Sequence, residues 1–481
     1  MTDWMSSLAS HYETLRDTYP DERLMIVFDI DGTILDMRHI ILHALNRFDR
    51  NHGTKYFEKV RIPDIDFHED HLPDLLERLQ IPAEERHFIE EDYRRLLSSS
   101  ASILECHQPF RGVLEAIRWF QMQPKTFVGL NTGRPESMRF HTLRALNRLG
   151  HEYRVEFLDG LLFMNDDISR HITKTKLLGI DHFRKLGYRI IAVVDNEPEN
   201  LDAMSKIDGH SEVLLLHADT IFRSREECMP KQAVQGKHYD FTKLVMRESI
   251  PKHTQFVWRC DNTRANLNSF LQSNVRWLEI DLRCFSPYMQ GPDEHSLTTF
   301  TLDECFGLIK EHKKAIKLNL NRGGLLLGSI RGMIQKHSID DSSLWFQGSS
   351  LVLGEDGFRL LRSFFPSAIL QCPVDIFAQI VSDEPVIVKE KLLLLQRWGI
   401  NRFGISWLTI NKRRLISCLR QWGFETDIYN VAAFESFLKA LLFLPNSITS
   451  RFSCNAAWSH PRDLSGKVQF PPDDSIFRHV A

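Results

Sequence analysis

Acidic residues that directly follow apolar runs are the feature of this sequence best suited to chemistry. The run at residues 24–28 ends at Asp29, and Asp31 and Gly32 follow it. Five apolar residues without a charge are typical of a strand buried on both faces of a parallel sheet. Because ligands of open α/β sheets bind at the carboxyl ends of the strands, both carboxylates are expected there. Two adjacent carboxylates need a cation or a proton between them. An aspartate that only caps a helix is the structural alternative.

A hydroxyl and a glycine follow the next apolar run. Residues 126–130 lead into Asn131, Thr132, Gly133, Arg134 and Pro135. A threonine hydroxyl at a strand end, beside exposed backbone N–H groups, can donate to a phosphoryl oxygen. Arg134 would be an additional clamp. A simple turn is the alternative, because Gly and Pro are common in loops.

Two lysines, Lys174 and Lys176, precede a helix-patterned run that ends at Gly187. The ammonium of either one could neutralise a strand-end carboxylate and a bound phosphate. Lys174 fits the helical phase of Leu177 and Leu178 better, and Lys176 remains the alternative. A third apolar segment lies at 161–164, before the lysines. A further run at 190–194 ends at an aspartate, and a last run at 213–216 completes an expected parallel core of five strands.

These pieces resemble, in order, the four motifs of the haloacid dehalogenase superfamily, whose members mostly hydrolyse phosphate esters through an aspartyl-phosphate. The resemblance covers about residues 20–220 and implies a Rossmann-like core. It implies that Asp29 is the nucleophile and that Asp31 is the general acid and base. The phosphate would be bound by Thr132, Gly133, Arg134 and Lys174.

The same resemblance implies a Mg²⁺ site. Its ligands would be Asp29, the main-chain carbonyl of Asp31, Asp195 and Glu199, with Glu197 as the alternative to Glu199. The fourth motif departs from the usual pattern in two places. Val194 stands where glycine is usual, and Glu199 stands where aspartate is usual.

The insert between the first two strands is rich in helical patterns. In this superfamily an insert at that position is a helical type-1 cap, and residues 37–120 are assigned to it. A cap would keep water away from the reacting phosphate, and a helical decoration without a catalytic role is the alternative. The first domain is expected to span residues 1–224, and a polar linker is expected at 225–252.

The remaining residues, 253–481, show a different repeating pattern. Short apolar segments alternate with helix-patterned stretches, and there are eight such segments before residue 453. This arrangement predicts a (β/α)₈ barrel, with a doubly wound sheet as the alternative. The expected strands are 256–258, 277–282, 315–320, 344–347, 368–371, 402–407, 425–429 and 447–452.

Acidic and basic residues recur at two-residue spacing on two of these strands. Glu279 and Asp281 share one face, and Lys317 and Asn319 repeat the spacing on the next strand. With a tryptophan on the first strand and Asn262 after it, they resemble glycerophosphodiester phosphodiesterase-like barrels, the menorin-like branch in particular. The expected histidine is missing, since the first strand ends Trp258-Arg259-Cys260, and His295 is a doubtful substitute for the second. The acids would bind a cation or form a satisfied interior network.

The composition is that of a globular protein. The chain has 481 residues and a formal net charge of −3, so its charge favours neither nucleic acid nor an anionic membrane as a partner. The N-terminal residues lack the pattern of a signal peptide. Eight widely spaced cysteines without a C-x-x-C pair indicate a reducing cytoplasm.

The leading hypothesis is a Mg²⁺-dependent phosphomonoesterase that acts on a phosphorylated small molecule. Its barrel would serve recognition or would be degenerate. A two-headed phosphodiesterase and phosphatase is one alternative, and a non-catalytic phosphate-binding scaffold is the other.

Overall fold

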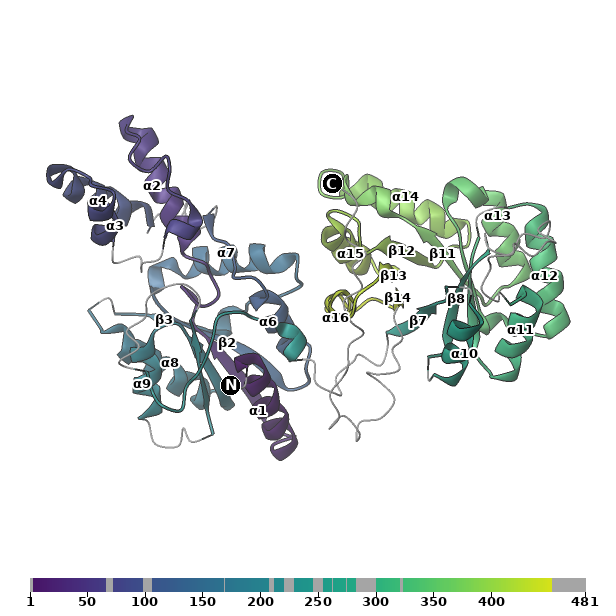
Figure 1. Cartoon of the computed structure of the whole chain (residues 1–481), viewed down its shortest axis with the longest axis horizontal. Coiled ribbons are helices and arrows are strands. Elements are labelled where there is room, and N and C mark those ends of the chain that lie inside the picture. The colour runs from purple at the N-terminus through teal and green to yellow at the C-terminus, as the bar shows by residue number, and fades with distance from the viewer. Residues whose placement is uncertain are drawn as a thin grey trace. The chain divides into compact units, whose positions relative to one another are not determined.

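The structure is a computed structural model. It describes residues 3–65, 72–97, 106–167, 169–206, 212–219, 229–244, 254–261, 263–273, 275–282, 300–320 and 323–451. The chain divides into two compact units, Met1–Met246 and Arg247–Ala481, drawn in purple to teal and in green to yellow in Figure 1. Asn262 and His295, which the sequence analysis considered for the barrel, lie outside the described residues.

A parallel sheet organises the first unit. The described strands follow the order β3-β2-β1-β4-β5-β6, and every neighbouring pair is parallel. The central strand is buried after its first residue, as its uninterrupted apolar sequence predicts. The strands are β1 (Arg23–Phe28), β2 (Thr126–Pro135), β3 (Leu162–Asn165), β4 (Tyr188–Asp195), β5 (Leu214–Ala218) and β6 (Val234–Gly236).

Helices cover this sheet and form its core with it. Helices α6 and α8 pack against β2, and α9 packs against β4 and β5. Met25, Val27, Ile180, Phe183 and Leu201 are buried together in one apolar cluster between sheet and helices. The helices are α1 (Trp4–Thr18), α6 (Val113–Gln121), α7 (Arg139–His151), α8 (Ile172–Lys185) and α9 (Pro198–Ser205).

Three helices of the insert form one group, in which the last helix packs against the other two; we call this group the cap, after the cap that the sequence predicts. They are α2 (Arg38–His52), α3 (Leu72–Arg78) and α4 (Ala83–Leu97), and Figure 1 shows them together, apart from the sheet. The cap is shorter than the sequence suggested, because α6 packs against β2 and so belongs to the core. Its two connections to the core pair with each other: Asp36 N donates to Gln108 O at 2.8 Å, and Phe110 N donates to Ile34 O at 2.9 Å.

Part of the expected linker belongs to the first unit. Residues 234–236 form β6, which pairs with β5, so the sheet extends beyond residue 224. The indole of Trp4 donates to His238 O at 2.8 Å, and its ring contacts the Tyr239 ring with centroids 4.9 Å apart. These contacts fix the segment against α1. The polar composition of residues 225–252 gave no sign of this pairing.

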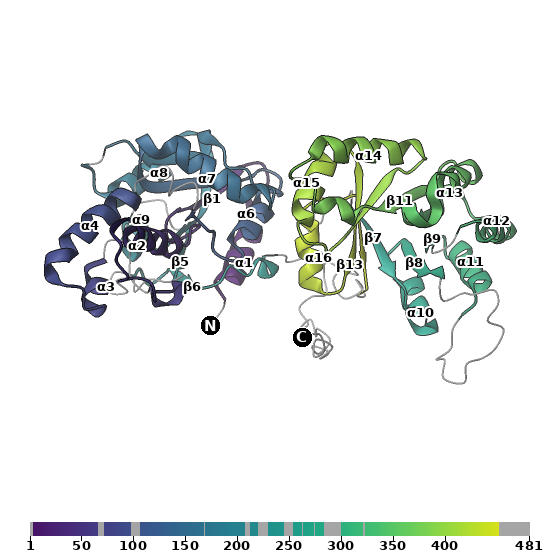
Figure 2. The ribbon, with the colours of Figure 1, turned by 90° about the horizontal axis from the view of Figure 1, so that it is seen from above.

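In the second unit, eight described strands close into a parallel barrel. Each segment expected as a strand overlaps one of them, and closure excludes the doubly wound alternative. Figure 2 shows the helices surrounding the strands. The strands are β7 (Gln255–Arg259), β8 (Trp277–Asp281), β9 (Ala315–Asn319), β10 (Leu344–Gln347), β11 (Ile369–Pro373), β12 (Arg402–Ser406), β13 (Glu425–Val431) and β14 (Ser447–Ser450). The helices are α10 (Arg264–Gln272), α11 (Leu302–Glu311), α12 (Leu325–His337), α13 (Ser350–Phe364), α14 (Pro385–Arg397), α15 (Lys412–Gln421) and α16 (Phe434–Leu441).

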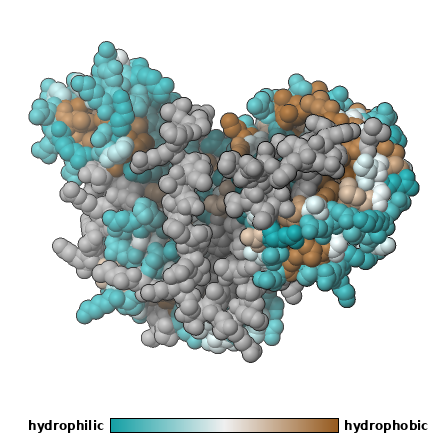
Figure 3. Space-filling model, turned by 45° about the vertical axis from the view of Figure 1, so that its right-hand side comes forward, coloured by the Kyte–Doolittle hydropathy of each residue, from teal (hydrophilic) through white to brown (hydrophobic). Residues whose placement is uncertain are grey.

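The surface mixes hydrophilic and hydrophobic residues on the face that Figure 3 draws. Several of the most exposed aliphatic side chains follow the barrel strands: Leu351, Ile376, Leu408 and Ile410. Within the part of the chain that the structure describes, no helix combines the length and apolarity that crossing a bilayer requires.

Candidate active site

Three strand ends and one helix start meet at one edge of the first sheet. Asp29 follows β1, Thr132 lies near the end of β2, and Asp195 is the last residue of β4. Because β1 pairs with both β2 and β4, these residues share the carboxyl edge of the sheet. This is the edge at which the sequence analysis expected a ligand.

Lys176, from the beginning of α8, reaches between the two aspartates. Its Nζ pairs with Asp29 Oδ1, donates to Asp195 Oδ2 at 3.0 Å and donates to the main-chain oxygen of Asn131 at 2.7 Å. In return, Asn131 Nδ2 donates to Lys176 O at 2.7 Å. The lysine is therefore fixed at both its side chain and its backbone, and it joins the two acids into one buried cluster.

The structure corrects the sequence-based preference for Lys174, whose side chain is exposed. Helix α8 buries Thr175, Lys176, Gly179 and Ile180, and it leaves Leu178 38% exposed. Of the two leucines taken to mark the buried face, Leu177 packs against the core but Leu178 points away from it. The buried face is built partly from small residues: a Cβ at Gly179 would lie 2.4 Å from the side chain of Asn131.

Burial and neighbouring charge change the titration of this cluster. Burial, together with the charges of Asp195 and Asp31, raises the pKa of Asp29 to about 7, although Lys176 opposes the effect. For Lys176, burial lowers the pKa, but the two aspartates outweigh burial and the pKa is raised. Such perturbation is typical of catalytic groups, although structural ion pairs produce it as well.

Asp31 lies beside the cluster in a separate ion pair. Arg134 Nε donates to Asp31 Oδ2 at 2.7 Å, and Arg134 Nη2 donates to Asp31 Oδ1 at 2.5 Å. Burial alone would raise the pKa of Asp31, but the charge and hydrogen bonds of Arg134 lower it overall. Arg134 was expected to bind phosphate, whereas here its planar fork is occupied by Asp31.

Two buried residues that the sequence analysis did not select hold Arg134. His107 Nε2 lies 3.1 Å from Arg134 Nη2, and Arg134 Nη1 donates to Thr142 Oγ1 at 3.2 Å. Both His107 and Thr142 are 0% exposed. A lone histidine after the cap carries no spacing signal, so only the fold could identify it.

The expected phosphate-binding loop lies next to the start of α8. Thr132 is buried, and its Oγ1 accepts from Arg134 N at 3.2 Å. A Cβ at Gly133 would lie 3.0 Å from Ile172, the first residue of α8. Gly133 therefore allows the β2 end to approach the helix N-terminus closely, where N–H groups favour an anion.

The groups that contact Asp195 are not the second acid, Glu199, that the sequence analysis expected beside it. Asp195 Oδ1 accepts from Glu197 N at 2.9 Å and from Asn200 Nδ2 at 3.1 Å, and Asn200 Nδ2 lies 3.3 Å from Asp195 Oδ2. The side chain of Glu197 instead accepts from Asn196 Nδ2 at 3.0 Å. Glu199 is half-buried in the first turn of α9. Asn200, which was not selected from the sequence, thus orients Asp195.

The donor set at this edge suits a hard divalent cation. Asp29 and Asp195 supply carboxylate oxygens, and Mg²⁺ in proteins is commonly bound by one or two carboxylates, waters and substrate phosphate. When both acids are ionised, they keep one excess negative charge despite Lys176, since Arg134 offsets Asp31. Over the described ranges, no group of three or more His, Cys, Asp or Glu side chains is arranged to hold a metal. The site therefore fits a divalent cation in its charge and in the type of its ligand atoms.

Two further residues, Tyr239 and Gly32, shape the loop after β1. Tyr239 OH donates to Thr33 O at 2.9 Å, and burial, with the charges of Asp29 and Asp195, raises the pKa of Tyr239 well above its usual value. Gly32 has a φ of +76°, and a Cβ there would lie 2.6 Å from the side chain of Asn196. Glycine is thus required both for the turn and for contact with the β4 loop.

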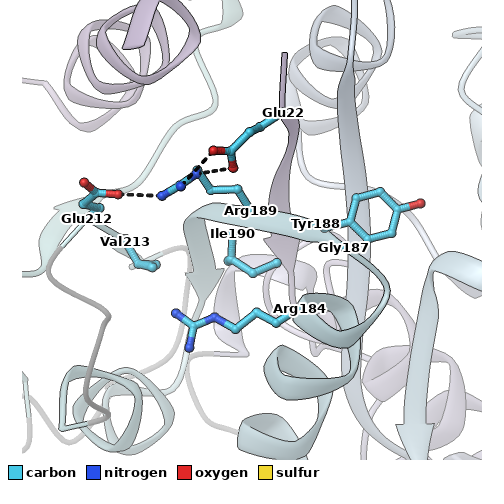
Figure 4. A pocket seen from close by; sticks show the side chains of 8 residues that line it. All are labelled: Glu22, Arg184, Gly187, Tyr188, Arg189, Ile190, Glu212 and Val213. Atoms are coloured by element: carbon cyan, nitrogen blue, oxygen red, sulfur yellow. Dashed lines mark hydrogen bonds and ion pairs between the residues drawn. The ribbon is translucent and has the colours of Figure 1, made fainter. Parts of the chain in front are cut away.

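A cavity in the first unit lies away from these residues. It has a volume of about 340 Å³ and is lined by Glu22, Arg184, Gly187, Tyr188, Arg189, Ile190, Glu212 and Val213. Figure 4 shows Arg189 between Glu22 and Glu212, which it contacts at 2.6 and 2.8 Å. Because the amino end of β4 contributes to this lining, the cavity lies at the sheet edge opposite the aspartates.

The selected barrel acids belong to a different network. Lys317 Nζ contacts Glu279 Oε2 at 3.0 Å and Asp427 Oδ2 at 2.9 Å, and it donates to Thr449 Oγ1 at 2.9 Å. Lys317 and Asp427 are 0% exposed, whereas Asp281, at the end of β8, is half-buried. The sequence pattern identified Glu279 and Lys317 but missed Asp427, which lies on a strand far along the chain.

An arginine stands where the sequence analysis noted a missing histidine. Arg259 Nε lies 3.5 Å from Glu279 Oε1, and Arg259 Nη1 donates to Asn430 Oδ1 at 2.9 Å. Glu279 therefore faces cations on two sides. Its Oε2, although buried, has no hydrogen-bond partner among the described residues, so the interior network is not fully satisfied and both readings of the barrel acids stay open.

Comparison with descriptions of protein families, and with curated proteins, found no match. Solved structures similar to the chain include a haloacid dehalogenase-like hydrolase from Streptococcus pneumoniae, with 14% identity over 45% of this chain and 93% of that one, at a TM-score of 0.30. They also include an Oleispira antarctica phosphodiesterase solved with its product sn-glycerol-3-phosphate (13% identity, 42% and 94%, TM-score 0.32). A third is a glycerophosphodiester phosphodiesterase from Agrobacterium tumefaciens (12% identity, 41% and 95%, TM-score 0.28).

Proposed function

We propose that the first unit hydrolyses phosphate monoesters of small molecules through a phosphorylated Asp29 and that it uses Mg²⁺. One observation carries the proposal: Asp29 meets Lys176 and Asp195 at the carboxyl edge of the sheet, with a second acid, Asp31, two residues away. Among the described residues, no hydrogen-bond donor contacts Asp29 Oδ2. That oxygen is the one left to react.

In the first step Asp29 Oδ2 attacks phosphorus while the bond to the leaving oxygen breaks, and that oxygen takes a proton from Asp31. In the second step Asp31 takes a proton from water, the water oxygen attacks phosphorus, and the bond to Asp29 breaks to release inorganic phosphate. The ion pair with Arg134 favours the carboxylate form of Asp31, which the second step needs, and disfavours the protonated form, which the first step needs.

The remaining groups position the phosphate and balance its charge. Lys176 and the Thr132 hydroxyl would stabilise negative charge on the phosphoryl oxygens, and the start of α8 would add N–H donors. Mg²⁺, held by Asp29, Asp195 and the main-chain carbonyl of Asp31, would supply further positive charge there. Glu199 could contribute through a water.

Hydrolysis of p-nitrophenyl phosphate tests the proposal. We expect turnover that needs Mg²⁺ and that disappears in D29N, because an amide cannot act as the nucleophile. E279Q, which changes an acid of the barrel, is the matched control and should retain turnover. Turnover that persists in D29N, or that is absent from the wild type with Mg²⁺, would refute the proposal.

A further inference from the structure

The connection that returns from the cap to the core contacts the proposed acid and base through one arginine. His107 lies on this connection, immediately before the residues that pair with the outgoing one. The chain of contacts runs from His107 Nε2 to Arg134 Nη2 at 3.1 Å, and from Arg134 to both carboxylate oxygens of Asp31. The connection from the cap and the reacting group Asp31 are thus joined by two successive side-chain contacts.

The chemistry of Arg134 and His107 determines which of them donates the hydrogen bond between them. A guanidinium has only donors, so His107 Nε2 accepts from Arg134, and a neutral His107 carries its proton on Nδ1. Nε2 of His107 is therefore a hydrogen-bond acceptor held in a fixed position. Thr142 Oγ1 accepts from the other terminal nitrogen of Arg134, so the plane of the guanidinium is held on two sides.

The plane of Arg134 in turn determines the orientation of Asp31. Two parallel N–H···O bonds fix a carboxylate in both distance and rotation. A carboxylate that must take a proton from water has to face that water, and an error of about 1 Å can cost about 100-fold in rate. Rotating Arg134 would therefore misdirect Asp31 without removing it.

We propose that His107 is a positioning residue for the reaction, which orients Asp31 through Arg134 and ties that orientation to the cap connection. The proposal rests on the proposed function, because it assigns Asp31 the deprotonation of water. It predicts that loss of the His107 acceptor slows hydrolysis of phosphorylated Asp29 more than its formation.

Two substitutions separate positioning from a merely structural role. The amide oxygen of glutamine can reach the place of Nε2, whereas that of asparagine reaches only the place of Nδ1. H107Q should therefore keep the contact with Arg134, and H107N should lose it while remaining polar. With p-nitrophenyl phosphate, nitrophenolate leaves without a proton from Asp31, so only the second step depends on Asp31.

Rapid mixing of each full-length variant with p-nitrophenyl phosphate and Mg²⁺ tests the proposal. We expect H107N to release nitrophenolate in a burst approaching one per enzyme and then to turn over about 10- to 100-fold more slowly than the wild type. H107Q should stay within about threefold of the wild type. If H107N does not fold, T142V, which removes the other support of Arg134, takes its place with the same expected burst.

The outcomes are distinguishable. A wild type without Mg²⁺-dependent turnover overturns the proposed function, and this proposal with it. An active wild type with an unchanged H107N overturns the role of His107 alone. So does a slow H107N without a burst, or a loss of the same size in H107Q, because each would indicate general damage to the site.

Discussion

Both units contain a buried lysine between two acids, but the two clusters are built differently. In the barrel, Asp427 accepts from Ser447, Thr449 and Gln371 as well as from Lys317, and its side chain is 0% exposed. In the first unit, Asp29 keeps a carboxylate oxygen that no described donor contacts. In the barrel, Glu279 Oε2 is also buried without a hydrogen-bond partner. An acid–lysine–acid cluster with an available acceptor therefore does not indicate catalysis by itself.

The two clusters also differ in what lies beside them. Asp31 lies next to the first cluster, and it is the group that a two-step transfer needs. Beside Glu279 in the barrel lies Arg259, a second cation. The barrel cluster is thus close to charge balance, whereas the first keeps an excess negative charge when Asp29 is ionised. This difference predicts catalytic effects in one unit and stability effects in the other.

The largest expected effect is loss of turnover in K176M. Without the ammonium, two buried carboxylates repel each other and the phosphoryl charge loses a partner, so turnover of p-nitrophenyl phosphate should fall by at least about 100-fold. K174M is the matched control, since Lys174 is exposed on the same helix, and it should retain wild-type turnover. Equal losses in the two variants would contradict the assignment of Lys176.

The second effect is on the stability of the barrel. K317M leaves Glu279 and Asp427 without their shared cation, and breaking a buried pair in this way costs about 3–5 kcal/mol. Urea unfolding followed by fluorescence should show this loss, while turnover by the folded protein is unchanged. K336M, which removes an exposed ion pair with Asp303, should cost less than about 1 kcal/mol. A smaller loss in K317M than in K336M would contradict the account.

A smaller effect is expected for the loop after β1. G32A places a Cβ against Asn196 at a positive φ, so we expect a loss of about 1–3 kcal/mol in the free energy of unfolding together with reduced turnover. G53A is the control: Gly53 also has a positive φ, but no heavy atom lies within 4 Å of its Cβ position. Thermal melts of both variants check this, and a G53A loss as large as that of G32A would show that the contact with Asn196 is unimportant.

The smallest effect concerns the segment after β6. Y239F removes the hydrogen bond to Thr33 O and should cost about 1 kcal/mol of stability. Because Tyr239 lies near the aspartates, turnover should also fall, but only slightly. A melting temperature equal to that of the wild type would mean that the tyrosine hydroxyl does not support this loop.

The sequence predicted the groups that follow buried strands, because an apolar run and its terminal acid are visible together. The positions of Asp29, Thr132 and Asp195 at one edge of the sheet were predicted in this way, and closure of the barrel followed from the spacing of its strands. Lys176 was missed as first choice because the buried face of α8 uses small and polar residues. His107, Asn200 and Tyr239 are single polar residues in connections, and only tertiary contacts give them a role.

The most direct test of the account is to identify the phosphorylated residue. The full-length protein is mixed with p-nitrophenyl phosphate and Mg²⁺, quenched rapidly in acid and analysed by peptide mass spectrometry. The account predicts a phosphoryl adduct on Asp29 that is absent in D29N. An adduct on another residue, or full turnover by a D29N protein, would contradict it.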